Sequence, residues 1–140
     1  MLTEMEVINA VERYLHGRGF VTKEKVPTVQ SRGRDLVMES RSGTLLVVEA
    51  KGQSSSQPHT ALVAEEFSRS QKEAHLGRAI VSTMWTLSRG YNSAIALPGD
   101  SVDEQLVNDR KAALERLGLV VLFVDPEDGS VRVEVGALPL

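Results

Sequence analysis

Three charged residues near the middle of the chain, Asp35, Glu49 and Lys51, are of types that can hydrolyse a phosphodiester. Two apolar runs flank the turn Ser40-Arg41-Ser42-Gly43, which predicts one β-hairpin between Asp35 and Glu49. If the hairpin folds about Ser42, Asp35 lies opposite Glu49, because each is seven residues from that centre. Side chains alternate along a strand, so Glu49 and Lys51 share a face. Carboxylate oxygens suit a hard cation such as Mg²⁺, and a neighbouring lysine can hold a phosphate or orient a water.

Helical and strand patterns on both sides of the hairpin indicate the elements that must position these residues. Apolar spacing predicts a helix over residues 4–18 with Thr3 as its N-cap. Residues 20–29 predict an edge strand, because Pro27 cannot donate to a ladder. The remaining pattern predicts a helix over 60–89 with a candidate break near His75-Leu76-Gly77, a strand over 93–97, a helix over 103–117, and strands over 119–124 and 131–135.

The order of these elements predicts the fold class. An α-β-β-β-α-β core is followed by an added helix and a C-terminal strand pair, which predicts an α/β fold with a mixed sheet flanked by helices. If the third and fourth strands are parallel, the long helix between them should form a right-handed crossover. At 140 residues we expect one domain, spanning residues 1–140.

The composition limits which classes of protein and which cellular compartment we expect. No apolar window is long enough to span a bilayer, and the start of the chain lacks a signal pattern. The absence of cysteine excludes disulfides and thiolate metal sites, so we expect a cytoplasmic protein without a membrane partner. The net charge is −3, yet residues 13–34 hold six basic side chains against the single acid Glu24. This basic region, directly before Asp35, suits phosphate contacts, although solvated surface charges are the alternative.

The order helix-borne glutamate, Asp35, then Glu49-Ala50-Lys51 resembles the PD-(D/E)XK nuclease superfamily, which includes restriction endonucleases and archaeal Holliday-junction resolvases. The segment EVINAVERYLHGRGF resembles the opening helix of that superfamily, and GRDLVMESRSGTLLVVEAKG resembles its core hairpin. The segment HLGRAIVSTMWTLSRGYNSAIALP resembles the following helix and strand, so the resemblance covers most of residues 4–98. Arg34 replaces the proline of the motif, a frequent departure in the superfamily. The resemblance implies a restriction-endonuclease-like version of the predicted fold.

The resemblance also implies a set of catalytic and metal-binding residues. Asp35 and Glu49 would be metal ligands, with the backbone carbonyl of Ala50 as a candidate third. Lys51 would position the attacking water or neutralise charge on the scissile phosphate. The alternative is that Lys51 simply neutralises Glu49, and both can be true. Against the alternative, Glu49 follows four consecutive apolar residues, where an unpaired carboxylate is costly to bury.

A glutamate on the first helix commonly completes the site in this superfamily. Glu4, Glu6 and Glu12 are the candidates. Glu4 is favoured because it shares the apolar stripe of its helix and so would point at the sheet. An acid in the first turn is also what the helix dipole prefers, which leaves the choice open.

Basic side chains near the hairpin and on the long helix are candidate substrate contacts. Two of them flank the entry to Asp35, and the others lie on the helix that follows the hairpin; they are Arg32, Arg34, Arg69, Lys72 and Arg78. His75 is predicted to be structural or on the surface. Trp85 and Tyr91 are predicted to pack in the core and at a helix end rather than to stack bases.

These observations predict a Mg²⁺-dependent nuclease that acts on DNA, with structure-selective or weakly sequence-specific cutting. Mn²⁺ could replace Mg²⁺, and RNA stays open as a substrate. Cutting two strands with one site per chain favours a homodimer, while a separate DNA-reading or protein partner would explain the modest basic charge. The alternatives are a catalytically silent nuclease-fold protein that binds nucleic acid or a protein, and a structural domain in which Glu49–Lys51 is only an ion pair.

Overall fold

The computed structural model describes residues 1–27, 34–54 and 66–140. These residues form a six-stranded sheet in the order β1-β2-β3-β4-β5-β6, which is also the order along the chain. The strands are β1 Val21–Lys25, β2 Leu36–Glu39, β3 Leu45–Ala50, β4 Asn92–Pro98, β5 Val120–Val124 and β6 Val131–Val135. The helices are α1 Glu4–Gly17, α2 Arg69–Ser88, α3 Ser101–Asn108 and α4 Lys111–Leu117. In the described parts of the chain, no helix is both long and apolar enough to cross a membrane.

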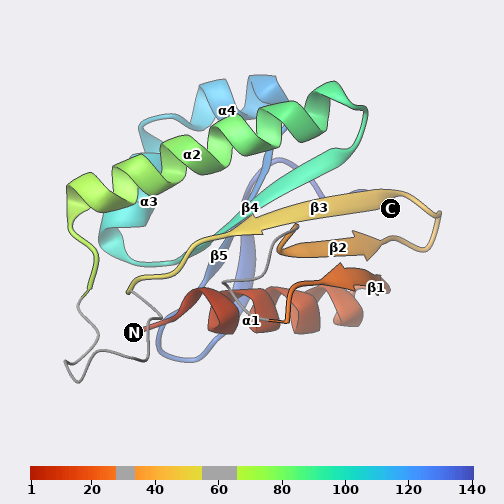
Figure 1. Cartoon of the computed structure of the whole chain (residues 1–140), viewed down its shortest axis with the longest axis horizontal. Coiled ribbons are helices and arrows are strands. Elements are labelled where there is room, and N and C mark those ends of the chain that lie inside the picture. The colour runs from red at the N-terminus through yellow and green to blue at the C-terminus, as the bar shows by residue number, and fades with distance from the viewer. Residues whose placement is uncertain (28–33, 55–65) are drawn as a thin grey trace.

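The sheet is mixed, as predicted. β3, β4 and β5 are parallel to one another, while β1–β2, β2–β3 and β5–β6 are antiparallel pairs. Helix α1 covers one face of the sheet, and α2, α3 and α4 cover the other (Figure 1). Because both faces are covered, β5 is buried along its whole length. The predicted α/β fold is therefore confirmed, including the C-terminal strand pair.

The hairpin of β2 and β3 has the predicted register. Leu36 pairs with Val48 and Glu39 with Leu45, so one further step of the same ladder places Asp35 opposite Glu49. Gly43 closes the turn with a left-handed φ of 86°, and its N–H donates to the Ser40 carbonyl over 3.0 Å. The local sequence therefore positions the two carboxylates.

The first helix and first strand also follow their predictions. Thr3 caps α1 in a capping box, in which its hydroxyl accepts from the Glu6 N–H and the Glu6 carboxylate accepts from the Thr3 N–H. β1 is an edge strand that pairs with β2 alone, and a bulge interrupts the pairing between Thr22 and Glu24.

The long helix α2 differs from its prediction, because it is continuous through residues 75–77. Gly77 is exposed, and the neighbouring residues Leu76 and Ala79 are buried against the sheet. Their burial offsets the cost of about 1 kcal/mol that a glycine imposes on a helix interior. The helix begins at Arg69 with Ser68 as its N-cap, so residues 66–68 of the predicted helix are not helical. Residues 60–65 of the predicted helix lie outside the described residues.

The single helix predicted over residues 103–117 is instead two short helices, α3 and α4. The chain leaves the helical conformation at Arg110, where φ is −119° and ψ is 6°, after the weak helix formers Asn108 and Asp109. The Arg110 guanidinium donates to the Leu106 carbonyl over 3.0 Å and so stabilises the turn. As a result, Leu117 of the predicted apolar stripe is 39% exposed.

The segment that leaves β3 docks onto the start of the chain. The Gln53 N–H donates to the Leu2 carbonyl over 2.8 Å, and the Leu2 N–H donates to Gln53 Oε1 over 2.9 Å. Between these bonds and the strand lies Gly52, where an added Cβ would stand 2.6 Å from the Glu4 nitrogen and 2.8 Å from the Thr3 carbonyl carbon. Only glycine permits this approach, which brings the first turn of α1 beside the end of β3.

We expect Gly52→Ala to lower the free energy of unfolding by about 1–3 kcal/mol, because the methyl group would push the start of α1 away from β3. Gly77→Ala is the matched control. A Cβ there meets no heavy atom within 4 Å among the described residues, so this exposed helix position should gain about 0.5–1 kcal/mol. Urea denaturation followed by circular dichroism measures both changes. Equal effects of the two substitutions would contradict the close-approach argument.

Candidate active site

Asp35, Glu49 and Lys51 lie together at the carboxyl end of β3. The Ala50 N–H donates to Asp35 Oδ2 over 2.8 Å, which holds the aspartate against β3. Lys51 Nζ is 3.7 Å from Glu49 Oε1, and these two side chains are 23% and 26% exposed. The Lys51 and Glu49 side chains are therefore partly buried but still open to solvent.

Glu4 joins this group from the first turn of α1. Burial raises the pKa of Glu4 from 4.5 to about 7, and the negative charges of Asp35 and Glu49 add to the rise while Lys51 opposes it. Burial also raises the pKa of Asp35, against the Ala50 hydrogen bond and Lys51. The pKa of Glu49 is raised by burial and then by the charge of Asp35. Burial therefore disfavours ionisation of all three carboxyl groups, and neighbouring carboxylates add to this effect for Glu4 and Glu49.

The other two candidate glutamates lie elsewhere. Glu6 is exposed and completes the capping box with Thr3. Glu12 Oε1 accepts from Lys25 Nζ over 2.7 Å, and Glu12 Oε2 accepts from the Thr22 hydroxyl over the same distance. The geometry thus brings only Glu4 of the three into the electrostatic field of Asp35, Glu49 and Lys51, and its role there stays a prediction.

The carboxyl groups of Asp35 and Glu49 supply oxygen donors, the kind that hard divalent cations prefer. Three carboxyl groups around one ammonium leave an excess of negative charge when all are ionised, which a cation would offset. Among residues 1–27, 34–54 and 66–140, no three His, Cys, Asp or Glu side chains form a group that could hold a metal. Mg²⁺ often binds a protein through one or two carboxylates and keeps several waters, so a site formed by Asp35, Glu49 and the Ala50 carbonyl stays a prediction.

The candidate substrate contacts have different surroundings. Arg34 is 35% exposed in its side chain, lies 3.9 Å from a Glu24 carboxylate oxygen, and stacks over the Tyr91 ring at 5.1 Å. Arg69 and Arg78 are exposed on α2 and so can meet a ligand. Arg32 lies outside the described residues.

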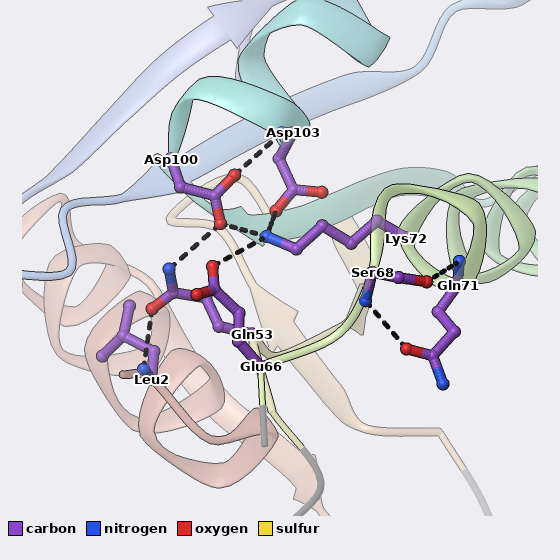
Figure 2. A network of polar contacts seen from close by, with 8 residues as sticks. All are labelled: Leu2, Gln53, Glu66, Ser68, Gln71, Lys72, Asp100 and Asp103. Atoms are coloured by element: carbon purple, nitrogen blue, oxygen red, sulfur yellow. Dashed lines mark hydrogen bonds and ion pairs between the residues drawn. The ribbon is translucent and has the colours of Figure 1, made fainter. Parts of the chain in front are cut away.

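Lys72 differs from the prediction that it contacts the substrate. Its ammonium is buried in an ion-pair network rather than presented to a phosphate (Figure 2). Only 2% of its side chain is exposed, and its Nζ pairs with Asp100 and, at 3.3 Å, with Asp103. Lys72 shares the buried stripe of α2 with Leu76 and Ala79, a helical spacing that points it at the sheet. This spacing is the signal in the sequence that could have identified it.

The Lys72 network connects the candidate site to the rest of the fold. Gln53 Nε2 donates to Asp100 Oδ2 over 3.0 Å while Gln53 Oε1 accepts from the Leu2 N–H, so four separate segments meet (Figure 2). Burial and the charge of Asp100 raise the pKa of Asp103 to about 7, against the attraction of Lys72. The network braces the loop that follows Lys51.

His75 lies closer to the site than predicted. Its ring meets Phe67 edge-on, with 4.5 Å between ring centroids. Burial lowers its pKa, and the positive charges of Lys51 and Arg78 lower it further. His75 is therefore within electrostatic reach of Lys51, a proximity that its isolated position in the sequence does not reveal.

A small pocket opens beside Glu49. Its volume is about 120 Å³, and it is lined by Arg34, Val47, Glu49, Ser82, Thr83, Trp85 and Thr86. Trp85 is 53% exposed, so the prediction that it packs in the core is wrong. A larger cavity of about 910 Å³ lies between α1, β6 and the C-terminal residues, and none of the candidate site residues lines it.

We expect Glu4→Gln to stabilise the protein at about pH 8 but not at about pH 4.5. The folded-state pKa lies above the ordinary value, so the penalty of ionised Glu4 is absent below about 4.5 and complete above about 7. Removing the charge should therefore raise the free energy of unfolding at pH 8 on the order of 1–2 kcal/mol. Urea denaturation at both pH values measures this, with exposed Glu6→Gln as control. An equal gain at both pH values would rule out the charge as the cause.

We expect Lys72→Met to lower the free energy of unfolding by about 3–5 kcal/mol, because it leaves buried carboxylates without their cation. Arg78→Met, an exposed cation on the same helix, should change it by about 0.5 kcal/mol or less. Thermal or urea denaturation compares the two variants. A loss for Lys72→Met as small as that of the control would show that the network does not stabilise the fold.

Comparison with known proteins gives a likeness of fold. No protein-family model matches the chain, and no curated protein matches it. Among solved structures, it is similar to SPO1766, a protein of unknown function from Silicibacter pomeroyi, with a TM-score of 0.52 and 18% identity over 99% of this chain and 73% of that one. Pyrococcus furiosus SfsA in complex with Ca²⁺ matches with a TM-score of 0.37 and 17% identity, over 97% of this chain and 62% of that chain. The first match shows a shared fold, and neither assigns an activity.

Proposed function

We propose that this chain is a metal-dependent nuclease that hydrolyses DNA at the site formed by Asp35, Glu49, Lys51 and Glu4. The observation that carries the proposal is the convergence of three carboxyl groups and one ammonium, from the start of β2, the end of β3 and the first turn of α1. Their raised pKa values indicate an arrangement built at a cost in stability. Perturbed carboxyl groups that gather around a partly exposed ammonium are typical of functional sites.

Asp35 and Glu49, with the Ala50 carbonyl, would hold Mg²⁺ or Mn²⁺. The bound cation would supply a Lewis acid for the phosphoryl oxygens. Lys51 would hold the scissile phosphate or orient the attacking water, since its ammonium lies beside Glu49 and is partly exposed. Attack of water on phosphorus forms a new P–O bond and breaks the bond to the leaving oxygen. The attacking water loses one proton, and the leaving oxygen takes up one proton from solvent. Glu4 would accept the proton from the attacking water, as a carboxylate within the electrostatic field of Asp35 and Glu49.

Arg34, Arg69 and Arg78 would contact the phosphate backbone of the substrate. Arg34 lines the pocket beside Glu49, and the other two are exposed on α2. We propose a homodimer, in which two copies of the site could cut two strands, or a separate DNA-reading subunit. A separate DNA-reading subunit would add cationic surface to a chain whose own net charge is −3.

We expect the wild-type chain to cut at least one nucleic acid when Mg²⁺ or Mn²⁺ is present, and to lose this activity in EDTA. Lys51→Ala should lower the cleavage rate by about 100- to 1,000-fold, because it removes a cation aimed at developing negative charge. The assay compares supercoiled plasmid, linear duplex, a four-way junction, and single-stranded DNA and RNA. Lys111→Ala, a lysine on α4, is the matched control and should cut at the wild-type rate.

Isothermal titration with Mg²⁺ separates the remaining outcomes. Metal binding that is lost in Asp35→Asn, without cutting of any substrate, would favour a catalytically silent relative that binds nucleic acid or a protein. Cutting that survives in Lys51→Ala would contradict the assignment of the site. Absence of both binding and cutting would leave Glu49 and Lys51 as a structural ion pair.

A further inference from the structure

The outer face of α2 carries an unusual group of exposed apolar side chains near its C-terminal end. Val81, Met84 and Trp85 are 69%, 46% and 53% exposed. The Arg89 guanidinium lies over the Trp85 ring at 4.3 Å, a cation–π contact that holds the indole in place while half of the residue stays in solvent. A large aromatic ring fixed in this way offers a flat binding surface at little entropic cost.

Trp85 also lines the pocket beside the candidate site. The pocket lies between Ser82, Thr83, Trp85 and Thr86 of α2 and Val47 and Glu49 of β3, with Arg34 completing its wall. Glu49 is one of the two proposed metal ligands. The pocket therefore leads from the exposed indole to the place where a phosphodiester would be cut.

A second arginine–aromatic pair lies at the same end of α2. Arg34 stacks over the Tyr91 ring at 5.1 Å, and the Tyr91 N–H donates to the Thr86 carbonyl over 3.3 Å, which places Tyr91 at the end of the helix. Arg34 and Thr86 both line the pocket. One guanidinium and one aromatic ring, those of Arg34 and Trp85, thus line the opening. Each makes a cation–π contact with a residue outside the pocket lining, Tyr91 and Arg89 respectively.

The charges of this face favour a polyanion over a second copy of the chain. The cations of this face are Arg34, Arg89 and Arg78, which lies about two helical turns before Trp85 on α2. Its acids are Glu49, which pairs with Lys51, and Glu24, which lies 3.9 Å from Arg34. A symmetric dimer through this face would set the arginines of one copy against those of the other. A nucleic acid instead offers phosphates to the arginines and flat bases to the indole.

We propose that Trp85 stacks against an unpaired base of the nucleic acid, so that the substrate is single-stranded or locally unpaired beside the cleaved bond; this rests on the proposed nuclease function. In a duplex each base is already stacked between its neighbours, and reaching one costs unstacking energy. A pocket of about 120 Å³ beside Glu49 admits a single small group and has no room for a base pair. The indole therefore selects substrates whose bases are already free.

The chain contains one tryptophan, so fluorescence excited at the red edge of the indole absorption, where Tyr14 and Tyr91 absorb little, reports on Trp85. The first measurement titrates the Lys51→Ala protein, in Mg²⁺, with an oligothymidylate of about 16 nucleotides and with a blunt duplex of the same length. We expect saturable quenching by the oligothymidylate and little quenching by the duplex. Equal quenching by both would overturn the selection for unpaired bases.

The second measurement uses the anisotropy of a labelled oligothymidylate to compare variants in the same Lys51→Ala background. Trp85→Leu should weaken binding roughly ten- to a hundredfold, whereas Trp85→Phe should keep most of the affinity because the ring can still stack. Met84→Ala is the matched control, since Met84 is exposed on the same helix but does not line the pocket. Equal affinities of the Leu and Phe variants would overturn stacking as the mode of binding.

Cleavage by the wild-type chain, measured separately, distinguishes this inference from the proposed function. Metal-dependent cutting without quenching would overturn the role of Trp85 and leave the nuclease in place. Quenching without cutting of any substrate would support base stacking and overturn the nuclease. Loss of self-association in Trp85→Leu by sedimentation, with no effect on nucleic acid binding, would assign the face to a contact between copies and overturn the inference.

Discussion

The close approach of Gly52 to the first turn of α1 is the contact on which the rest of the candidate site depends. Helix α1 packs on one face of the sheet, whereas Glu49 belongs to the set of β3 residues that faces α2. Side chains from opposite faces can meet only where the strand ends. The absence of a Cβ at Gly52 allows the chain to cross there within contact distance of the Glu4 nitrogen, and the hydrogen bonds between Gln53 and Leu2 fix the crossing. Gln53 also joins this crossing to the Lys72 network, since its side-chain amide donates a hydrogen bond to Asp100. One glycine and one glutamine therefore link α1, β3, α2 and α3.

The electrostatics of the site oppose stability, and the surrounding structure compensates. Glu4, Asp35 and Glu49 all have pKa values raised by burial, with Lys51 as the cation that opposes each rise. Lys72 lies in the reverse situation, because two aspartates hold its charge and raise its pKa despite burial. The two clusters are adjacent, joined by residues 51–53. Asp100 and Asp103 enclose the buried Lys72 ammonium, and Gln53 is tied to this cluster through Asp100. Lys51 and Glu49, in contrast, are partly exposed to solvent.

The parts of the fold that depend on local pattern were predictable from the sequence, and the parts that depend on tertiary contacts were not. The register of β2 and β3 follows from the turn at Gly43 and the alternation of side chains, so the opposition of Asp35 and Glu49 could be derived from the hairpin. The place of Glu4 depends on the approach at Gly52, which no periodicity reveals. The division between α3 and α4 arises at Arg110, an ordinary helix former whose guanidinium caps the preceding turn. Lys72 and Trp85 reversed the usual expectation for their residue types, since the lysine is buried and the tryptophan is exposed.

That reversal follows from the shape of α2. The stripe that faces the sheet begins with Lys72 and continues through Leu76 and Ala79 to Thr83 and Thr86, so its apolar bulk diminishes along the helix. The two threonine hydroxyls donate to the Ile80 and Ser82 carbonyls of their own helix, at 2.8 and 3.3 Å, and so need no partner on the sheet. Small side chains with internally satisfied hydroxyls leave a gap between α2 and β3 that leucine or phenylalanine would fill. The pocket beside Glu49 is that gap. The pocket leaves apolar area unburied at the end of α2 where Trp85 is also exposed. A ligand bound at this end of the helix would cover both the pocket and the indole.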